Sequence, residues 1–299
     1  MNEATVHIRR GHSESLWRLT WRQFRRHRLA LFSLGLLIVL SVVALFAEQL
    51  APYDPNDIDP RNPNVIRGYP QPPDATHLLG TDDFNRDLLS RALYGMRLSM
   101  LVGVFAMLIG VSVGVVVGTV AGYAGGALDN ALMRTVDIFL SVPSFMLFLA
   151  LNALLQPGIW AIVLILGMFS WMEVSRLVRA EFLALKERDF VLAAHAIGVT
   201  PRQMVMRHLL PNAMAPIIVA ATLAIPAAIL SESALSFIGL GVPPPDASLG
   251  SMLQDAKAWL IDAWWMWIIP GALISVIVLA FNFVGDGLRD ALDPTLHRR

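Results

Sequence analysis

LSMLVGVFAMLIGVSVGVVVGTVA, residues 98–121, is an apolar run of 24 residues without a single charged side chain. The hydrocarbon core of a bilayer is about 30 Å thick, and a helix rising about 1.5 Å per residue crosses it in about 20 residues. We therefore expect this run to form a membrane-spanning helix. The class of the whole chain then depends on how many similar runs accompany it.

The composition agrees with a polytopic membrane protein. Of the 299 residues, 56% are hydrophobic and 15% are charged, and the mean hydropathy is +0.58. An average soluble domain is about 45–50% apolar and about 25% charged. These values exclude an ordinary soluble enzyme, and they also exclude a disordered chain, which would be poor in apolar residues. Cysteine is absent, so the chain has neither a disulfide framework nor a thiolate metal site.

Six runs are long and apolar enough to be candidate spans, so the sequence predicts an all-α integral membrane protein with six transmembrane helices. Only Gln156, Pro157 and Gly158 separate the third run from the fourth, and this tripeptide is typical of a tight turn. The six candidates are Leu29–Ala47, Leu98–Ala121, Ile138–Leu155, Gly158–Met172, Ala213–Leu230 and Ala263–Val284.

The orientation follows from the basic residues, which favour the cytoplasmic side. Segments on the side of the two termini carry 7 + 1 + 6 + 3 = 17 Lys and Arg, whereas the other side carries 5 + 1 = 6. Both termini are therefore expected in the cytoplasm. The resulting parts are a basic, amphipathic segment at 1–28, a first transmembrane helix at 29–50, an extracytoplasmic segment at 51–97, a five-helix core at 98–284 with a cytoplasmic loop at 173–212, and a cytoplasmic tail at 285–299.

The N-terminal segment allows two interpretations. Leu16, Trp17, Thr20, Trp21 and Phe24 share one helical face, which is typical of a helix lying on the membrane surface. A plain basic flank that only sets the topology explains the same arginines.

The spans lack the residues that would drive transport by themselves. None of the six runs contains Asp, Glu, Lys, Arg or His, and the nearest acids (Asp137, Glu173, Glu232 and Asp286) stand at the ends. This argues against an ion-coupled carrier and against a membrane metalloenzyme. The chain also lacks a G-x-x-x-x-G-K-[ST] phosphate loop. Energy is therefore expected to come from a partner protein, and no metal or cofactor is expected on this chain.

Two sets of residues inside the spans are candidates for packing and for transport. Glycine recurs every four residues in the second span, which favours close packing against another helix over a ligand-lining face; the stripe is Gly110, Gly114, Gly118 and Gly122. Small polar residues and a proline near the third and fifth spans could line a translocation path or bond to neighbouring helices, and both readings stay open. This second set is Ser141, Pro143, Ser144, Asn152, Ser231 and Ser233.

The loop at 173–212 is predicted to hold two helices separated by a sharp stop. The first helix covers Glu181–Ile197, and Gly198 ends it. Thr200 is expected to cap the second helix, with Pro201 in its first turn and Gln203 closing a capping box. We expect this helix to run to Leu210 and to end at Pro211. A helix this short is not stable alone, so one side is expected to pack on the membrane ends. The other side is expected to meet a soluble partner, with Arg202, Arg207 and His208 around an apolar strip of Met204, Val205 and Leu209.

The string AAHAIGVTPRQMVMRHLLPN, residues 193–212, resembles the EAA loop of ABC-importer permeases. The match rests on Ala193, Ala194, Gly198 and the pair Pro211-Asn212. Leu192 stands where the family has glutamate. In such permeases this loop couples to an ATPase, so the resemblance implies a coupling site at Ala193, Ala194, Gly198, Thr200, Pro201, Arg202, Gln203, Arg207, His208, Pro211 and Asn212.

Three further strings resemble the C-type subunit of dipeptide and oligopeptide permeases: LGTDDFNRDLLSRALYGMRLSMLVG at 79–103, ESALSFIGLGVPPPDASLGSMLQDA at 232–256 and NFVGDGLRDALDP at 282–294. Asn85 stands where glycine is usual, and Leu249 where tryptophan is usual. The resemblance implies a type I ABC importer transmembrane domain in a bacterial or archaeal inner membrane. Its implied partners are a B-type permease subunit, two ATPases that hold ATP and Mg²⁺, and an extracytoplasmic binding protein.

Several alternatives remain open at this level. Short peptides are the default substrate, while nickel chelates, glutathione, peptide antibiotics and oligosaccharides are carried by similar permeases. An ion-driven carrier, an exporter half lacking its ATPase, and a lipid transferase built on Asp82, Asp83, Arg86 and Asp87 are the competing functions. Nothing indicates a nucleic-acid partner, and membrane lipid is expected around the spans. Residues 48–97 are expected to cover the outer vestibule or to dock the binding protein, in preference to a Ca²⁺ site around Asp54–Asp59.

Overall fold

The computed structural model describes residues 16–58, 68–154 and 158–292, and its regular elements in this part of the chain are all helices. The predicted all-α class is therefore confirmed. The elements are α1 (Leu16–Phe24), α2 (Arg28–Leu45), α3 (Ala47–Leu50), α4 (Leu88–Ala124), α5 (Gly126–Leu140), α6 (Ser144–Leu154), α7 (Ile159–Lys186), α8 (Asp189–Ala196), α9 (Pro201–Gln203), a π-helical turn (Met204–Leu209), α10 (Leu210–Phe237), α11 (Leu249–Asp255), a 3-10 turn (Ala256–Trp259) and α12 (Trp264–Leu292).

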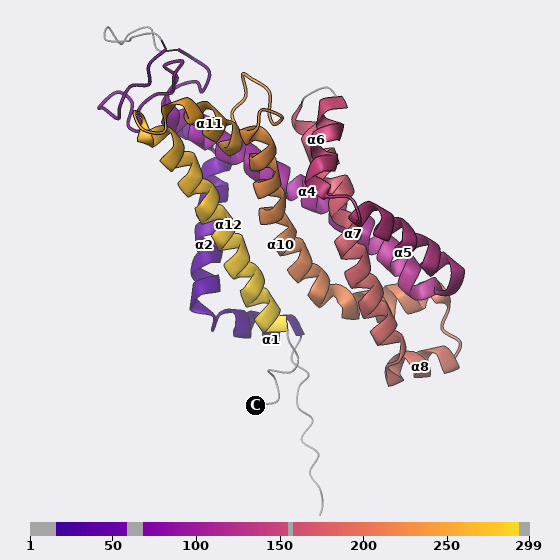
Figure 1. The fold of residues 1–299 in the computed structure, drawn as a ribbon. Coiled ribbons are helices and arrows are strands. Elements are labelled where there is room, and N and C mark those ends of the chain that lie inside the picture. The colour runs from indigo at the N-terminus through magenta and orange to yellow at the C-terminus, as the bar shows by residue number, and fades with distance from the viewer. Residues whose placement is uncertain (1–15, 59–67, 155–157, 293–299) are drawn as a thin grey trace, which may run out of the picture.

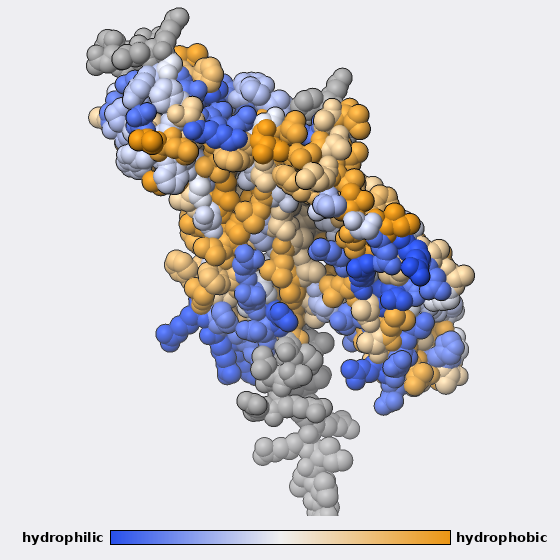
Figure 2. Space-filling model, in the orientation of Figure 1, coloured by the Kyte–Doolittle hydropathy of each residue, from blue (hydrophilic) through white to orange (hydrophobic). Residues whose placement is uncertain are grey.

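Five helices in the described residues are long and apolar enough to cross a membrane: α2, α4, α7, α12 and the continuous helix from Pro201 to Phe237. The pair α5 and α6 adds a sixth candidate if the two count as one broken span. Figure 2 shows the apolar surface as a band across the middle of the molecule, with hydrophilic side chains gathered at its ends. This distribution is the one expected of a multi-pass membrane protein.

The third predicted span is wrong as a single helix over Ile138–Leu155. The chain forms α5, bends by 81° and continues as α6. Pro143 explains the break, because proline has no backbone N–H and disfavours helical geometry in the residue before it. Ser141 closes α5 by donating its hydroxyl to the carbonyl oxygen of Ile138 at 2.7 Å.

Other boundaries also differ from the prediction, because helices continue beyond the apolar runs. Most of the residues expected in the 122–137 loop belong to α5, and α4 starts ten residues earlier than Leu98, at Leu88. Helix α7 continues to Lys186, deep into the loop predicted from residue 173. Polar residues of these extensions find partners: Lys186 Nζ donates to the carbonyl oxygen of Tyr123 at 3.0 Å, at the C-terminal end of α4.

The glycine stripe of α4 lies against α7 at very short range. A Cβ built on Gly118 would be 2.5 Å from the carbonyl oxygen of Ser175, and one built on Gly114 would be 2.6 Å from Cβ of Val174. Gly110 and Gly122 approach α7 in the same way, near Ser170 and Phe182 respectively. Absence of side chains at four successive turns therefore lets two helical backbones come together.

Helices α2, α4, α10 and α12 pack around a common buried core that includes Ile229 and Ile277. Phe24 of α1 is buried against α12, where Gly287 leaves room for it and for Ala30. In Figure 1, α1 and α8 lie at one end of the bundle, while the segments around residues 51–58 and 68–87 lie with α11 at the other. We call this second group the cap. Of the predicted 1–28 segment and 285–299 tail, residues 1–15 and 293–299 lie outside the described chain.

Candidate functional site

The first candidate site is the α8–α9 segment, defined as residues 189–212. The predicted single helix over Glu181–Ile197 is wrong, because α7 ends at Lys186 and α8 begins at Asp189. Helix α8 ends at Ala196 and is followed by Gly198, whose φ of +78° belongs to the left-handed region that L side chains rarely adopt. Val199 N donates to the carbonyl oxygen of Ala194 (3.2 Å) and Gly198 N to that of His195 (3.0 Å). These two bonds form a Schellman motif, which satisfies the last carbonyls of a helix and turns the chain sharply.

The next helix begins with the predicted capping box. Thr200 Oγ1 accepts from Gln203 N, and Gln203 Oε1 accepts from Thr200 N, both at 3.4 Å. Pro201 occupies the first turn, where a missing N–H leaves no bond unmade. The local start and stop signals of the sequence are therefore reproduced in the geometry.

The expectation that Pro211 ends this helix is wrong. The helix passes through a π-helical turn at Met204–Leu209 and continues as α10 to Phe237. A π-turn shifts the hydrogen-bond register, and Pro211 follows at the start of α10, where its missing N–H is tolerated. Asn212 Nδ2 donates to the carbonyl oxygen of His208 at 2.6 Å, which gives this carbonyl a side-chain partner within the turn.

The inner face of the α8–α9 segment is buried against α7 and α10. Val191, Ala194, Met204 and Leu209 are each at most 5% exposed and pack with Phe182 of α7 in one apolar cluster. The expectation that Met204 and Leu209 form part of an apolar strip facing a partner is therefore wrong, because both pack into the helical bundle, and Val205 is partly buried there. Apolar contact on this side fixes a segment that is too short to be stable alone.

The opposite face combines exposed apolar and basic side chains. Ile197 is 82% exposed, Met206 58% and Leu192, at the glutamate position of the resembled family, 56%. Exposed apolar side chains rimmed by charge are typical of a surface that binds another protein. Of the eleven predicted coupling residues, Ala194 is buried, His208 is half-buried, and the others are exposed: Ala193, Gly198, Thr200, Pro201, Arg202, Gln203, Arg207, Pro211 and Asn212.

A cavity of about 490 Å³ lies between α4, α6, α7 and α10. Its walls are mostly apolar, and Ser144, Ser170, Glu173 and Ser231 supply the polar groups. Two of the six predicted path residues, Ser144 and Ser231, therefore line this cavity.

The other four path residues lie elsewhere. Ser141 and Pro143 form the break between α5 and α6. Asn152 donates to the carbonyl oxygen of Leu240, and Ser233 is buried where Gly250 of α11 approaches α10. The structure does not bring these four into the cavity of Ser144 and Ser231. Glu173 does line that cavity, although the sequence placed it only at the end of a span.

Glu232 is a buried acid for which the sequence predicts no role. It is 0% exposed and accepts hydrogen bonds from Ser236 at 2.7 Å and from Ser99 at 3.1 Å. Ser99 Oγ in turn accepts from the backbone N–H of Leu249, at 3.3 Å. This network joins α4, α10 and α11, so the buried carboxylate secures the cap to the bundle. The serines surrounding residue 232 in the sequence were the available signal.

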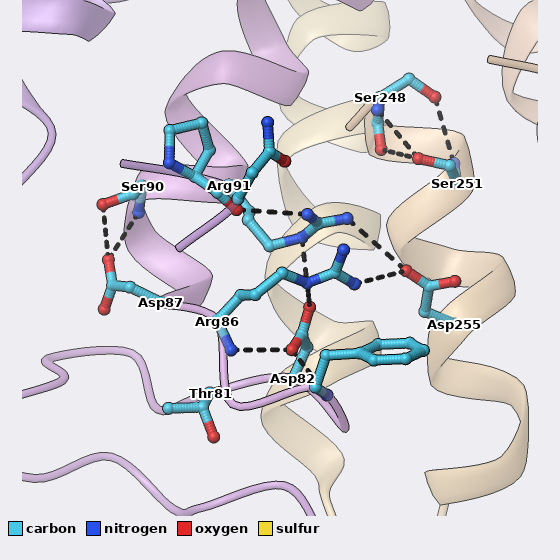
Figure 3. Close-up of polar contacts among 12 residues, drawn as sticks. Thr81, Asp82, Arg86, Asp87, Ser90, Arg91, Ser248, Ser251 and Asp255 are labelled. Atoms are coloured by element: carbon cyan, nitrogen blue, oxygen red, sulfur yellow. Dashed lines mark hydrogen bonds and ion pairs between the residues drawn. The ribbon is translucent and has the colours of Figure 1, made fainter. Parts of the chain in front are cut away.

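An ionic network ties the cap to the start of α4 (Figure 3). Asp82 accepts from Arg86 Nε at 2.6 Å and lies 3.3 Å from Arg91 Nε. Both guanidinium groups also face Asp255 at the end of α11, at 3.8 and 3.7 Å. Asp83, beside this network, is half-buried, and burial raises the pKa of its carboxyl group.

Asp87 forms a second connection at the same place. Its carboxylate caps α4 by accepting from Ser90 N at 2.8 Å, and its other oxygen is 2.9 Å from His77 Nδ1. Asn85, at the position where the resembled family has glycine, has φ of +61°, which explains that preference because glycine and asparagine tolerate the left-handed region.

Within the Asp82–Asp87 cluster considered for an enzyme, the carboxylates of Asp82 and Asp87 bind arginines, a histidine and backbone amides, and so hold the fold together. Among the described residues, no group of three or more His, Asp or Glu could hold a metal ion. Of the Ca²⁺ site considered around Asp54–Asp59, Asp59 lies outside the described residues.

The sequence profile of a protein family described as "binding-protein-dependent transport system inner membrane component" matches residues 114–298. The chain belongs to this family. A second profile, "N-terminal TM domain of oligopeptide transport permease C", matches residues 15–73 of the permease.

The permease is similar to curated relatives over nearly its whole length. It is 40% identical to a putative peptide permease protein of Brucella suis biovar 1 over 274 residues, which cover 91% of this chain and 89% of the relative. It is 36% identical to the oligopeptide transport system permease protein OppC of Bacillus subtilis over 286 residues, covering 96% and 92%. The resemblance to C-type peptide permeases is thereby confirmed.

The fold is similar to that of the MetNI methionine ABC transporter, solved in inward facing conformations. The match has a TM-score of 0.52 at 23% identity and covers 69% of the permease and 96% of the solved chain. Together with the family match, it confirms a type I ABC importer transmembrane domain. The permease is a multi-pass subunit of a binding-protein-dependent importer, which belongs to a family of transport proteins and not of enzymes.

Proposed function

We propose that the permease is the C-type half of a heterodimeric importer that carries short peptides into the cell. The names of its relatives, a peptide permease and an oligopeptide permease, support the substrate class. A related B-type subunit supplies the other half of the path, and an extracytoplasmic binding protein delivers the peptide. This chain is not an enzyme and holds no cofactor; ATP and Mg²⁺ belong to two partner ATPases.

The observation that carries this proposal is the two-sided construction of the α8–α9 segment. Its inner face is locked against α7 and α10, while Ile197, Met206 and Arg202 are exposed on the other side. A partner ATPase binds this exposed face. Because the helix starting at Pro201 is continuous with α10, movement of the ATPase reaches the membrane span without an intervening loop.

The topology fits the same proposal. Helix α1, with its arginines, and the α8–α9 segment lie at one end of the bundle (Figure 1), and basic residues favour the cytoplasmic side. Both termini are therefore cytoplasmic in an inner membrane, and the cap is extracytoplasmic, where the binding protein docks. The cavity lined by Ser144, Glu173 and Ser231 forms this subunit's share of the translocation path.

In the transport cycle, ATP binding closes the two partner ATPases and shifts the α8–α9 segments. The bundle then opens outward and receives peptide from the binding protein, and hydrolysis returns it to the inward-open state. Such coupling requires two states that the nucleotide on the partner stabilises differently.

Substitution of Gly198 tests the coupling role. In the assembled transporter in proteoliposomes, Gly198→Val is expected to leave ATP hydrolysis measurable and to lower peptide uptake per ATP at least tenfold. Valine does not tolerate the φ of +78° on which the Schellman turn depends. No heavy atom lies within 4 Å of a Cβ built on Gly198, so backbone conformation alone is tested.

Gly198→Asn is the matched control, because asparagine enters the left-handed region readily. It is expected to keep most of the uptake. Equal coupling in the valine and asparagine variants would contradict the role of this turn, and a wild-type transporter that takes up no peptide would contradict the substrate class.

A further inference from the structure

A second cavity, of about 370 Å³, lies at the cap end of the bundle and is distinct in its lining from the cavity of Ser144 and Ser231. Four separate parts of the chain form it: Asp54 of the segment after α3, Tyr94 and Arg97 of α4, Ile159 at the start of α7, and Asp246 of the connection between α10 and α11. The start of α4 and the region of α11 come together there (Figure 1).

Charges of both signs line this cavity without neutralising one another. Arg97 and Asp246 are exposed, and neither side chain forms a hydrogen bond or an ion pair with any residue of the described chain. Asp54 uses one carboxylate oxygen to accept from Asn56 N at 2.8 Å. A guanidinium and a carboxylate that share one pocket without pairing remain free for a ligand that carries both opposite charges.

The nearby arginines behave differently, which sets Arg97 apart. Arg86 and Arg91 sit within 4 Å of Asp82 and Asp255 in the ionic network of the cap. Their charges are therefore used by the fold. Arg97, two turns further along α4, has no such partner among the described residues and faces the cavity.

The rest of the lining is mixed. Leu98, Leu101 and Ile159 provide apolar side-chain surface, Ala247 adds a small wall residue next to Asp246, and Asn56 adds a polar side chain. Small-ligand sites combine apolar walls with a few polar groups, and they measure about 300–1,000 Å³. This cavity is therefore of a size for a peptide of two or three residues and too small for a folded partner.

We propose that this cavity binds the two charged ends of a short, unblocked peptide. Arg97 holds the α-carboxylate, Asp246 with the help of Asp54 holds the α-ammonium group, and the leucines contact the peptide side chains. The inference rests on the proposed function of peptide import. In this proposal the permease itself recognises free peptide termini at the cap end, before the peptide enters the cavity of Ser144 and Ser231.

The test measures peptide binding to the permease–ATPase complex in nanodiscs, without binding protein, by saturation-transfer NMR. The probes are the dipeptide Ala-Phe, its N-acetylated form and its C-amidated form. The wild type is expected to bind free Ala-Phe and to bind each blocked form at least about tenfold more weakly, since a hydrogen-bonded charge pair is lost. Arg97→Gln should abolish the preference against the amide, and Asp246→Asn the preference against the acetylated form.

Charge-preserving variants and an unrelated acid serve as controls. Arg97→Lys and Asp246→Glu should retain the preference for free termini. Glu48→Gln removes an exposed charge of α3 that does not line the cavity, and should leave binding unchanged.

Two results would overturn the inference: equal binding of free and blocked dipeptides by the wild type, or unaltered preference in both neutral variants. A third would also overturn it, namely a neutral variant that weakens docking of the binding protein while the terminal preference stays the same, since the charges would then serve a protein interface. Failure of the proposed function is distinguished by uptake: the wild-type transporter with its binding protein would then import no peptide at all.

Discussion

Replacing Gly118 by alanine should separate α4 from α7. A Cβ on this residue would lie 2.5 Å from the carbonyl oxygen of Ser175 and 2.7 Å from Cβ of Val178. Favourable contact between heavy atoms begins at about 3.4 Å, so the backbones must move apart by about 0.9 Å. The carbonyl belongs to the α7 backbone, and no change of rotamer relieves the clash. Overpacking of this kind costs about 1–3 kcal/mol.

Gly35→Ala is the matched control, because no heavy atom lies within 4 Å of a Cβ on this residue of α2. Both substitutions replace glycine by alanine inside a helix, so the gain in helix propensity cancels in the comparison. The difference in unfolding free energy between the two variants should therefore equal the steric cost of about 1–3 kcal/mol. It can be measured by SDS-driven unfolding in mixed micelles, followed by tryptophan fluorescence. Equal stability of the two variants would refute the close approach of α4 and α7.

Five further substitutions test other contacts by the same unfolding measurement. Asp83→Asn should stabilise the protein by less than about 1 kcal/mol at pH 7, because the pKa of this half-buried carboxyl group is raised and its charged form is disfavoured. The gain in stability should shrink as the pH falls through that pKa, because the acid is neutral below it. A gain that stays constant with pH would contradict this. Glu232→Ala should cost about 3 kcal/mol, because the buried hydroxyls of Ser99 and Ser236 lose the acceptor of their O–H groups and a void is left; a cost below about 1 kcal/mol would argue against the network. Asp129→Asn should cost about 1–2 kcal/mol, because it weakens a bidentate ion pair with Arg179 of α7. Asp137→Asn should cost less than about 0.5 kcal/mol, because its ion pair with Arg176 is exposed. A larger cost for Asp137→Asn than for Asp129→Asn would contradict this geometry. Asn85→Gly should be neutral or stabilising by up to about 1 kcal/mol, since φ is +61°, and a clear loss would show that the side chain is needed.

Local signals predicted local structure well. Gly198 stops α8 and Thr200 caps the next helix as expected, because each effect depends only on residues within one or two turns. The apolar runs likewise predicted which segments form the long helices, with limits set by bilayer thickness. They could not predict how far α4 and α7 extend, since those extensions depend on side chains meeting partners on other helices.

Prolines show why local signals are insufficient. Pro143 breaks a predicted span, whereas the helix that starts at Pro201 continues through Pro211. The difference comes from the surroundings of each proline. A π-helical turn before Pro211 shifts the hydrogen-bond register, and Asn212 donates a hydrogen bond to the carbonyl oxygen of His208. The ionic network of the cap and the Glu232 network join residues more than 130 positions apart, which no periodicity in the sequence reveals.

The uninterrupted helix from Pro201 to Phe237 has a mechanical consequence. Its 37 residues, at about 1.5 Å each, give a length along the helix axis of about 55 Å, and the helix curves on its way (Figure 1), with a π-helical turn at Met204–Leu209 and with Pro216 and Pro226 inside it. Glu232 stands five residues before the end of this helix at Phe237. In the proposed mechanism, one helix would therefore connect the surface that a partner ATPase displaces with the hydrogen bonds that hold α11 against the bundle.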